Sequence, residues 1–275
     1  MTRSTARRWD PRPALAWVAL VWVVLSAIGG CASTPGAAPA SRDMMTESDE
    51  PEARKRARIR MELAVGYFEQ GQTSVALDEV KQVIALDPGF PDAYNLRGLI
   101  YMRLNDLGQA EDSFRRAVAL NPRDANVQHN YAWLLCQQGR YDEAQRAFDV
   151  AMADPLYGGR AKTLMAQGLC QAKAGRTAEA ERSLARSYEL DAGNPVTGFN
   201  LATLLYRRGD YTRAQFYIRR LNNSELANAE TLWLGIKVER RLNDQVAMQQ
   251  LGEQLRKRYP QSREATAYDR GAFDD

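Results

Sequence analysis

The chain has 275 residues, of which 45% are hydrophobic and 26% are charged. These proportions are those of an ordinary globular protein, so they exclude both a largely disordered chain and a protein with many membrane spans. Basic residues exceed acidic ones by three, and this excess lies in residues 1–30, which hold four arginines and one aspartate. Residues 31–275 are formally neutral, so nucleic-acid binding has little support.

A short apolar helix is predicted near the start of the chain. Residues 14–28 contain Ser26 as their one polar member. This run is shorter than the roughly 20 residues that cross a bilayer and it follows several arginines, so residues 1–30 are predicted to be a signal peptide. Gly29 and Gly30 then lead to Cys31 in a pattern that resembles the bacterial lipobox, in which the cysteine is lipidated and becomes the first mature residue. Ordinary cleavage after a small residue is the alternative.

Lipidation of Cys31 implies an anchor of several acyl chains. Each methylene buried in the membrane contributes about 0.8 kcal/mol to the free energy of membrane binding. The following residue is Ala32 rather than aspartate, and by resemblance to bacterial lipoproteins this implies sorting to the outer membrane, facing the periplasm. Residues 31–56 are predicted to be the lipidated cysteine and a flexible tether, because most of them are Ala, Ser, Thr, Pro, Gly or charged residues without apolar periodicity. No cofactor is expected apart from this covalent lipid.

Pairs of small residues twelve positions apart recur six times in the rest of the chain, at intervals of 33 to 36 residues. The pairs are Ala64/Ala76, Gly98/Ala110, Ala132/Ala144, Gly168/Ala180, Ala202/Ala214 and Gly235/Ala247. A glycine or asparagine follows the first member of each pair by seven residues, or by eight in the last, and these residue types favour the left-handed conformation that ends a helix. Each unit is therefore predicted to be two antiparallel helices that cross closely at the small residues.

This periodicity resembles the tetratricopeptide repeat. The resemblance implies an all-α superhelix of about six helix-turn-helix units, with a concave surface lined by the first helix of each unit. The repeats are expected over residues 57–260, followed by a C-terminal cap and tail at 261–275. The expected units are 57–90, 91–124, 125–160, 161–194, 195–227 and 228–260.

The sequence contains little that could support catalysis. His129 is the one histidine and has no recognisable nucleophile in its neighbourhood, so we expect neither a catalytic residue nor a histidine-based metal site. The chain is predicted to be a non-enzymatic protein without a small-molecule substrate. His129 is assigned instead to the concave row of the third unit.

Two cysteines remain if Cys31 carries lipid. Cys136 and Cys170 are 34 residues apart, which is one repeat, and they fall at nearly equivalent positions in adjacent first helices. An even number of cysteines in an oxidising compartment predicts a disulfide between them. Two buried free thiols are the alternative.

The resemblance to the repeat family also selects the residues that should face a partner. The apolar candidates are Met61, Val65, Phe68, Leu99, Met102, Trp133, Met165, Leu169, Phe199, Tyr206, Leu232 and Ile236. The polar candidates are Asn95, Arg103, Asn126, His129, Gln137, Lys173, Arg207 and Arg240. Together they suggest an apolar groove with polar edges, which suits an extended segment or an amphipathic helix of a protein partner. Packing between adjacent helices is the alternative for each of them.

A lipidated cysteine, a short tether and six repeats without a second domain resemble the type IV pilus biogenesis and stability lipoproteins, the PilF/PilW pilotin family. The stretch from 119 to 132 and the ending at 258–262 carry further resemblance. It implies an outer-membrane lipoprotein that binds secretin subunits and promotes their localisation and multimerisation. Two alternatives remain: a repeat lipoprotein that scaffolds β-barrel assembly or cell-wall synthesis enzymes, and an exported enzyme.

Overall fold

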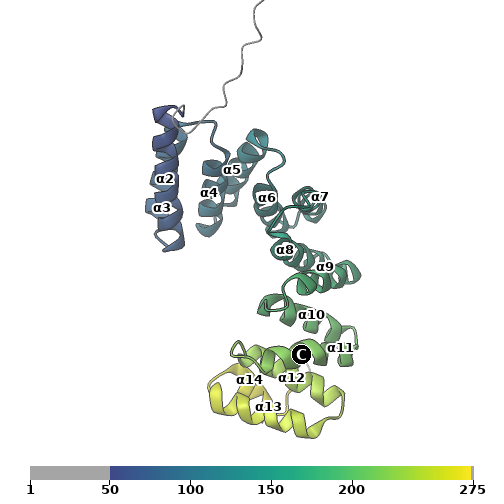
Figure 1. Ribbon diagram of the computed structural model, residues 1–275. Coiled ribbons are helices and arrows are strands. Elements are labelled where there is room, and N and C mark those ends of the chain that lie inside the picture. The colour runs from purple at the N-terminus through teal and green to yellow at the C-terminus, as the bar shows by residue number, and fades with distance from the viewer. Residues whose placement is uncertain (1–49, 274–275) are drawn as a thin grey trace, which may run out of the picture. The chain divides into compact units, whose positions relative to one another are not determined.

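The computed structural model describes residues 50–273, which form helices and no strands. The predicted signal peptide, Cys31 and most of the predicted tether lie outside the described residues. Among residues 50–273, no helix has both the length and the apolar character needed to cross a bilayer. The helices, labelled in Figure 1, are α2 (Glu52–Glu69), α3 (Thr73–Leu86), α4 (Pro91–Arg103), α5 (Leu107–Leu120), α6 (Ala125–Gln137), α7 (Tyr141–Met152), α8 (Arg160–Lys173), α9 (Thr177–Leu190), α10 (Pro195–Arg207), α11 (Tyr211–Asn222), α12 (Ala229–Arg241), α13 (Gln245–Arg258) and α14 (Arg263–Asp269).

Helices α2 to α13 form six consecutive pairs, each made of two neighbouring helices that pack on each other. The turn inside every pair contains one residue in the left-handed conformation, with φ between 60° and 86°. These residues are Gly71, Asn105, Gly139, Gly175, Gly209 and Asn243. They are the glycines and asparagines that the repeat pattern selects, so the predicted helix-turn-helix units are confirmed.

Small residues lie where the two helices of a pair cross. Ala64 and Ala76 are completely buried in the first pair. In the second pair, a Cβ atom added to Gly98 would lie 2.6 Å from the Phe114 ring. This distance is well below van der Waals contact, so the close approach of the helices requires glycine at position 98.

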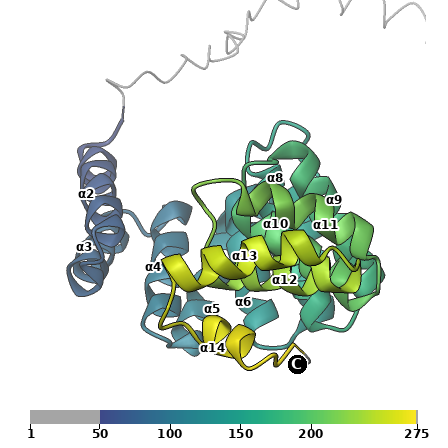
Figure 2. The same ribbon diagram turned by 90° about the horizontal axis from the view of Figure 1, so that it is seen from below.

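The pairs stack in chain order (Figures 1 and 2). The second helix of each pair packs on the first helix of the next, and successive first helices also contact one another. Within residues 50–273, successive second helices make no such contacts. The first helices are therefore closer together than the second helices, and the stack curves around them. We call the surface formed by α2, α4, α6, α8, α10 and α12 the inner face; it is the predicted concave surface of the repeat superhelix.

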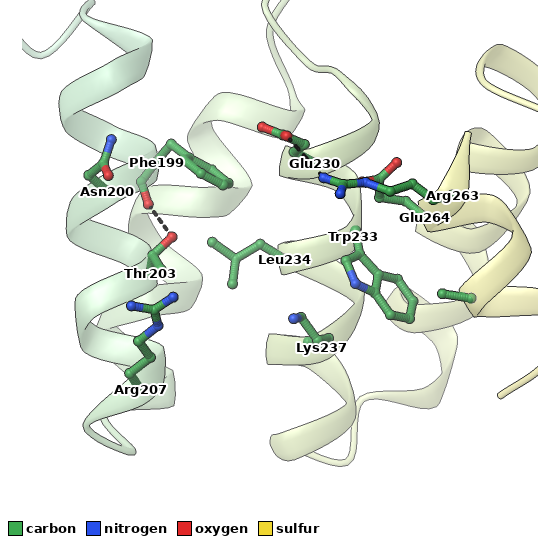
Figure 3. A pocket seen from close by; sticks show the side chains of 11 residues that line it. Phe199, Asn200, Thr203, Arg207, Glu230, Trp233, Leu234, Lys237, Arg263 and Glu264 are labelled. Atoms are coloured by element: carbon green, nitrogen blue, oxygen red, sulfur yellow. Dashed lines mark hydrogen bonds and ion pairs between the residues drawn. The ribbon is translucent and has the colours of Figure 1, made fainter. Parts of the chain in front are cut away.

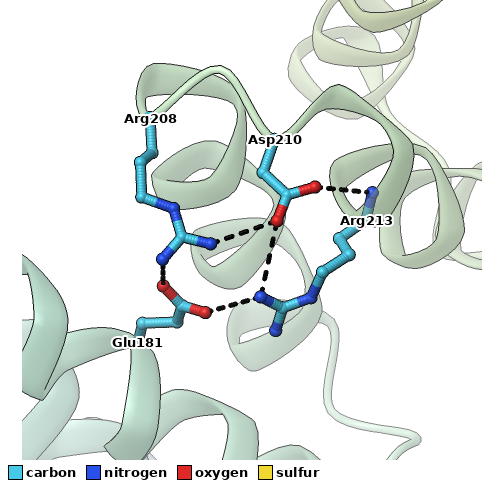
Figure 4. A network of polar contacts seen from close by, with 4 residues as sticks. All are labelled: Glu181, Arg208, Asp210 and Arg213. Atoms are coloured by element: carbon cyan, nitrogen blue, oxygen red, sulfur yellow. Dashed lines mark hydrogen bonds and ion pairs between the residues drawn. The ribbon is translucent and has the colours of Figure 1, made fainter.

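Ion pairs connect successive units on the side of the turns. In three cases an arginine in the turn of one unit bonds to an acidic residue on the second helix of the preceding unit. Figure 4 shows one, in which Glu181 accepts from Arg208 and Arg213. The other two are Arg140 with Glu111 and Arg176 with Asp142. Because the arginines are partly exposed, each pair is weakened by solvent, and we attribute to their repetition mainly the way in which each unit lies on its neighbour.

The first helix of the array begins before its sequence-based boundary, and the predicted C-terminal cap contains a further helix. α2 begins at Glu52, so the last residues of the predicted tether are helical, because residues 52–58 are Ala, Glu, Arg and Lys, which favour helices. At the other end, the predicted cap and tail contain α14, whose first turn is capped by Ser262. α14 packs on α12 and α13, so it covers the last repeat.

Candidate functional site

Most of the residues predicted to face a partner are partly accessible on the inner face. Most of the half-buried ones are apolar side chains that also pack against the core and therefore serve both packing and the surface. The half-buried residues are Met61, Phe68, Asn95, Leu99, Met102, Trp133, Met165, Leu169, Phe199, Tyr206 and Arg240. The exposed ones are Val65, Arg103, Asn126, Gln137, Lys173 and Arg207.

Three predicted partner-facing residues are instead buried. Leu232 and Ile236 are completely buried and belong to a cluster with Leu255 of α13 and Ala265 of α14. Their assignment to the groove surface is wrong because α14 supplies a packing partner at this end of the array. His129 keeps 6% of its surface exposed, so it is also unavailable to a partner.

Aromatic and cationic side chains pair along the inner face. In each case an aromatic residue of one first helix lies beside a cation of the next first helix, which places positive charge next to apolar surface. The Arg103 guanidinium lies 3.7 Å from the centroid of the Phe68 ring and donates to the Phe68 carbonyl oxygen at 2.6 Å. The other two pairs are Trp133 with Lys173 at 5.5 Å and Tyr206 with Lys237 at 5.7 Å.

Charge is divided unequally between the two sets of helices. The six first helices carry 14 Lys and Arg residues against six Asp and Glu residues. The six second helices carry 12 basic and 11 acidic residues. One of the acids on the first helices, Glu239, is buried against Arg219. The formal neutrality of residues 31–275 therefore conceals a net positive set of first helices.

A cleft of about 620 Å3 lies between α10, α12 and α14 (Figure 3). We call it the C-terminal cleft. Its apolar side chains are Phe199, Trp233, Leu234 and Ala267. Towards one end, Arg263 lies 3.7 Å from Glu230 and 3.1 Å from Glu264. Towards the other end, Figure 3 shows Arg207 and Lys237.

The sequence analysis identified only part of this cleft. Phe199 and Arg207 were among the predicted partner-facing residues, but Trp233, Leu234 and Lys237 were not. The cleft depends on α14 as its third wall, and the predicted cap at 261–275 did not specify a helix that packs on α12. The aromatic side chain of Trp233 in a first helix was the one available signal.

The junction between α6 and α8 brings two residue pairs together, each separated by one repeat of 34 residues. His129 Nδ1 lies 2.9 Å from Thr163 Oγ1, and this hydroxyl donates to the Tyr157 hydroxyl at 3.2 Å. The Sγ atoms of Cys136 and Cys170 lie side by side with the Cα atoms 5.8 Å apart, a Cα separation within the usual disulfide range. The junction can thus be cross-linked, and the disulfide remains a prediction for thiol chemistry to test.

The surroundings of His129 predict a pH-dependent stability. Burial, with a smaller effect of Lys162, lowers the pKa of His129 from 6.5 to about 4. Below pH 6.5 the unfolded chain binds a proton that the folded protein excludes, so stability is greatest above pH 6.5 and falls towards pH 4. We expect the free energy of unfolding to drop by about 2 kcal/mol between pH 7 and pH 5. Urea unfolding at the two pH values measures this drop.

The matched variant for this measurement is His129→Gln, which removes the chain's one histidine but keeps polar atoms near Thr163. Its stability is expected to change much less between pH 7 and pH 5. Equal pH dependence of the wild type and the variant would show that His129 is not the titrating group.

The described residues offer no evident catalytic centre. Among residues 50–273, no group of three or more His, Cys, Asp or Glu side chains could hold a metal ion. The buried His129 contacts hydroxyl groups in the junction between two units rather than in an open cleft. The accessible chemistry of the inner face is apolar, aromatic and cationic, which suits the binding of another molecule.

Known proteins that resemble this chain are tetratricopeptide repeat proteins of type IV pilus biogenesis. Two tetratricopeptide repeat models match residues 61–125 and 101–168. The type IV pilus assembly protein PilF of Pseudomonas aeruginosa is 28% identical over 246 residues, which cover 90% of this chain and 95% of that protein.

Two solved structures match this chain in fold over most of its length. PilW, described as a widely conserved type IV pilus biogenesis factor, has a TM-score of 0.72 at 29% identity and is matched over 78% of this chain and 98% of its own. The PilF structure from Pseudomonas aeruginosa has a TM-score of 0.72 at 28% identity, over 80% of this chain and all of that one. The chain is therefore a PilF/PilW-like tetratricopeptide repeat protein.

Proposed function

We propose that the protein is a non-catalytic assembly factor for type IV pili. It is attached to the outer membrane by lipid on Cys31, binds secretin subunits through its inner face and promotes their localisation and multimerisation. The observation that carries the proposal is the similarity to PilF, which extends over 95% of that pilus assembly protein rather than over a few repeats.

The surface chemistry supports a binding role of this kind. Accessible apolar side chains such as Phe68, Leu99 and Trp133 alternate with polar groups along adjacent first helices. Such a surface can hold a segment through a few apolar anchors, while polar groups at the edges select its orientation. A curved stack of similar units presents several such positions in a row.

The lipid has a physical purpose in this proposal. An anchored protein confines its inner face to a thin layer beside the membrane, so captured subunits reach a higher local concentration there than in the free periplasm. Oligomerisation depends steeply on concentration, and a modest affinity of the inner face for each subunit is then sufficient. No chemical step by the protein is required.

The proposal predicts that Cys31→Ala moves both the protein and the secretin away from the outer membrane. Most of the secretin multimer is expected to be lost, whereas the helical circular dichroism spectrum of the purified repeat domain stays unchanged, because Cys31 precedes the repeats. Membrane fractionation and immunoblotting of secretin multimers measure the effect. Ser33→Ala is the matched control, since it alters a neighbouring residue and leaves the lipidated cysteine in place.

Normal secretin multimers in a strain that lacks the protein would contradict the proposal. Purification of the lipidated protein from envelope extract distinguishes the proposed pilus function from the remaining alternatives. Secretin in the purified complex supports the pilus function. Recovery of barrel-assembly proteins or cell-wall synthesis enzymes without secretin would instead support the corresponding scaffold function.

A further inference from the structure

We infer that Asn95 and Asn130 together bind the main chain of an extended partner segment, accepting from the N–H group and donating to the C=O group of one residue. The inference rests on the proposed partner-binding function of the inner face, and it adds the conformation of the segment and the groups that are recognised. Three observations carry it: the pairing of the two amides, the groups that this pairing leaves unused, and the apolar side chains one helical turn away.

The two asparagines connect adjacent first helices. Asn95 lies in α4 and Asn130 in α6, and Asn130 Nδ2 donates to Asn95 Oδ1 at 3.0 Å. Both side chains are half-buried on the inner face. A hydrogen bond between the two amides restricts the rotation of both side chains, so they lose little conformational entropy when a partner binds.

The pairing leaves one donor and one acceptor unused. Each amide carries one oxygen and one amino group, and Asn95 Nδ2 and Asn130 Oδ1 bond to no other group among residues 50–273. In this part of the chain, the buried side-chain polar atoms without a partner are Tyr188 Oη and Asn222 Oδ1, so the two unused groups of the pair are open to solvent. Rotating both amides by 180° exchanges their roles and again leaves one amino group beside one oxygen.

A donor beside an acceptor matches the main chain of an extended segment. In a β-strand, the N–H and C=O groups of one residue point to the same side, and antiparallel strands pair through both groups. In an α-helix these groups are bonded within the helix itself, so an amphipathic helix would leave the asparagine pair unsatisfied. The pair therefore favours an extended segment over a helical one.

Apolar side chains lie one helical turn from each asparagine. Leu99 follows Asn95 by four residues in α4, and Trp133 follows Asn130 by three residues in α6, so each shares a helix face with its asparagine. Leu99 and Trp133 are both half-buried and accessible. Side chains on either side of the bonded residue can pack there, so the main-chain bonds set the position of the segment and the apolar contacts add affinity.

The test uses overlapping dodecapeptides that cover the periplasmic part of the secretin. Their binding to the purified lipidated protein in detergent is measured by fluorescence anisotropy. The peptide with the highest affinity is then prepared with a single N-methyl group at each position in turn. Because N-methylation removes one N–H donor, we expect affinity to fall about tenfold at one position and much less at its two neighbours, whose N–H groups point away.

Variants of the protein locate the contact. Asn95→Ala combined with Asn130→Ala is expected to weaken the parent peptide about tenfold, and the N-methyl peptide should then bind as well as the parent. Asn200→Ala on α10 is the matched control, because the Asn200 amide already donates to the Val196 carbonyl oxygen of its own helix at 2.8 Å. This control should bind both peptides as the wild type does. Circular dichroism establishes that each variant is folded.

Several results would overturn the inference. Binding of none of the peptides would remove the extended segment, and affinity lost at most N-methyl positions would indicate a helical one. A position-specific loss that persists in the double alanine variant, or an equal loss with Asn200→Ala, would remove the role of the asparagine pair.

Failure of the proposed function is recognised separately. Normal secretin multimers in a strain that lacks the protein would contradict the pilus function, whatever the peptides do. If the multimers are lost in that strain and one of the overturning peptide results is obtained, only the asparagine contact fails.

Discussion

Replacing Arg219 with methionine is expected to lower the free energy of unfolding by about 3 kcal/mol. Arg219 of α11 donates to both carboxylate oxygens of Glu239 on α12, at 2.7 and 2.9 Å, and the Glu239 side chain is completely buried. Without the guanidinium, the carboxylate keeps Gln215 as a neutral partner at 2.7 Å but loses its opposite charge. Urea unfolding followed by circular dichroism measures the loss.

Two controls distinguish the stability lost by leaving a buried charge unpaired from the stability lost by removing any arginine side chain. Arg186→Met removes an arginine from an exposed ion pair with Glu189 and should cost less than about 1 kcal/mol. Combining Arg219→Met with Glu239→Leu removes both charges, and much of the lost stability should return because no carboxylate then remains buried. A single Arg219 variant as stable as the Arg186 variant would mean that water reaches Glu239 freely.

Removing the predicted disulfide is the second change with a large expected effect. Cys136 and Cys170 are 2% and 4% exposed, so replacing both with alanine removes little volume and mainly the cross-link. Because the link closes a loop of 34 residues, the variant is expected to lose about 3 kcal/mol relative to the oxidised protein. Calorimetry and urea unfolding of oxidised protein and variant provide the comparison.

Reduction of the wild type provides the matched control for the cysteine variant. The reduced wild type and the alanine variant should have similar stabilities, both below that of the oxidised protein. Thiol labelling of periplasmic extract should leave Cys136 and Cys170 unlabelled until a reductant is added. Labelling of both cysteines without reductant would establish the alternative of two buried free thiols.

The parts of the fold that were predicted depend on short-range chemistry. Asn105 and Asn243 both have φ of 60°, and each was selected because it stands where a turn must follow a helix. Gly98 was selected because two helices must cross there, and the Phe114 ring leaves no room for a side chain. These requirements act within one unit of 34 residues, so a repeating sequence displays them directly.

The parts that were not predicted depend on contacts between distant segments. Ile236 was placed on the accessible surface because the pattern of one repeat cannot reveal that Leu255 and Ala265 will cover it. The C-terminal cleft was missed for the same reason. The positive charge of the first helices was also overlooked, because over residues 31–275 it is balanced by acidic residues that lie outside the repeat helices.

The helix α14 also limits how large an assembly the array can build. Every repeat exposes a face on which another repeat could stack, and an uncovered terminal face could accept the first repeat of a second molecule. In this protein α14 occupies that position with seven residues and packs on both α12 and α13. A second copy could stack on the last repeat only by displacing α14.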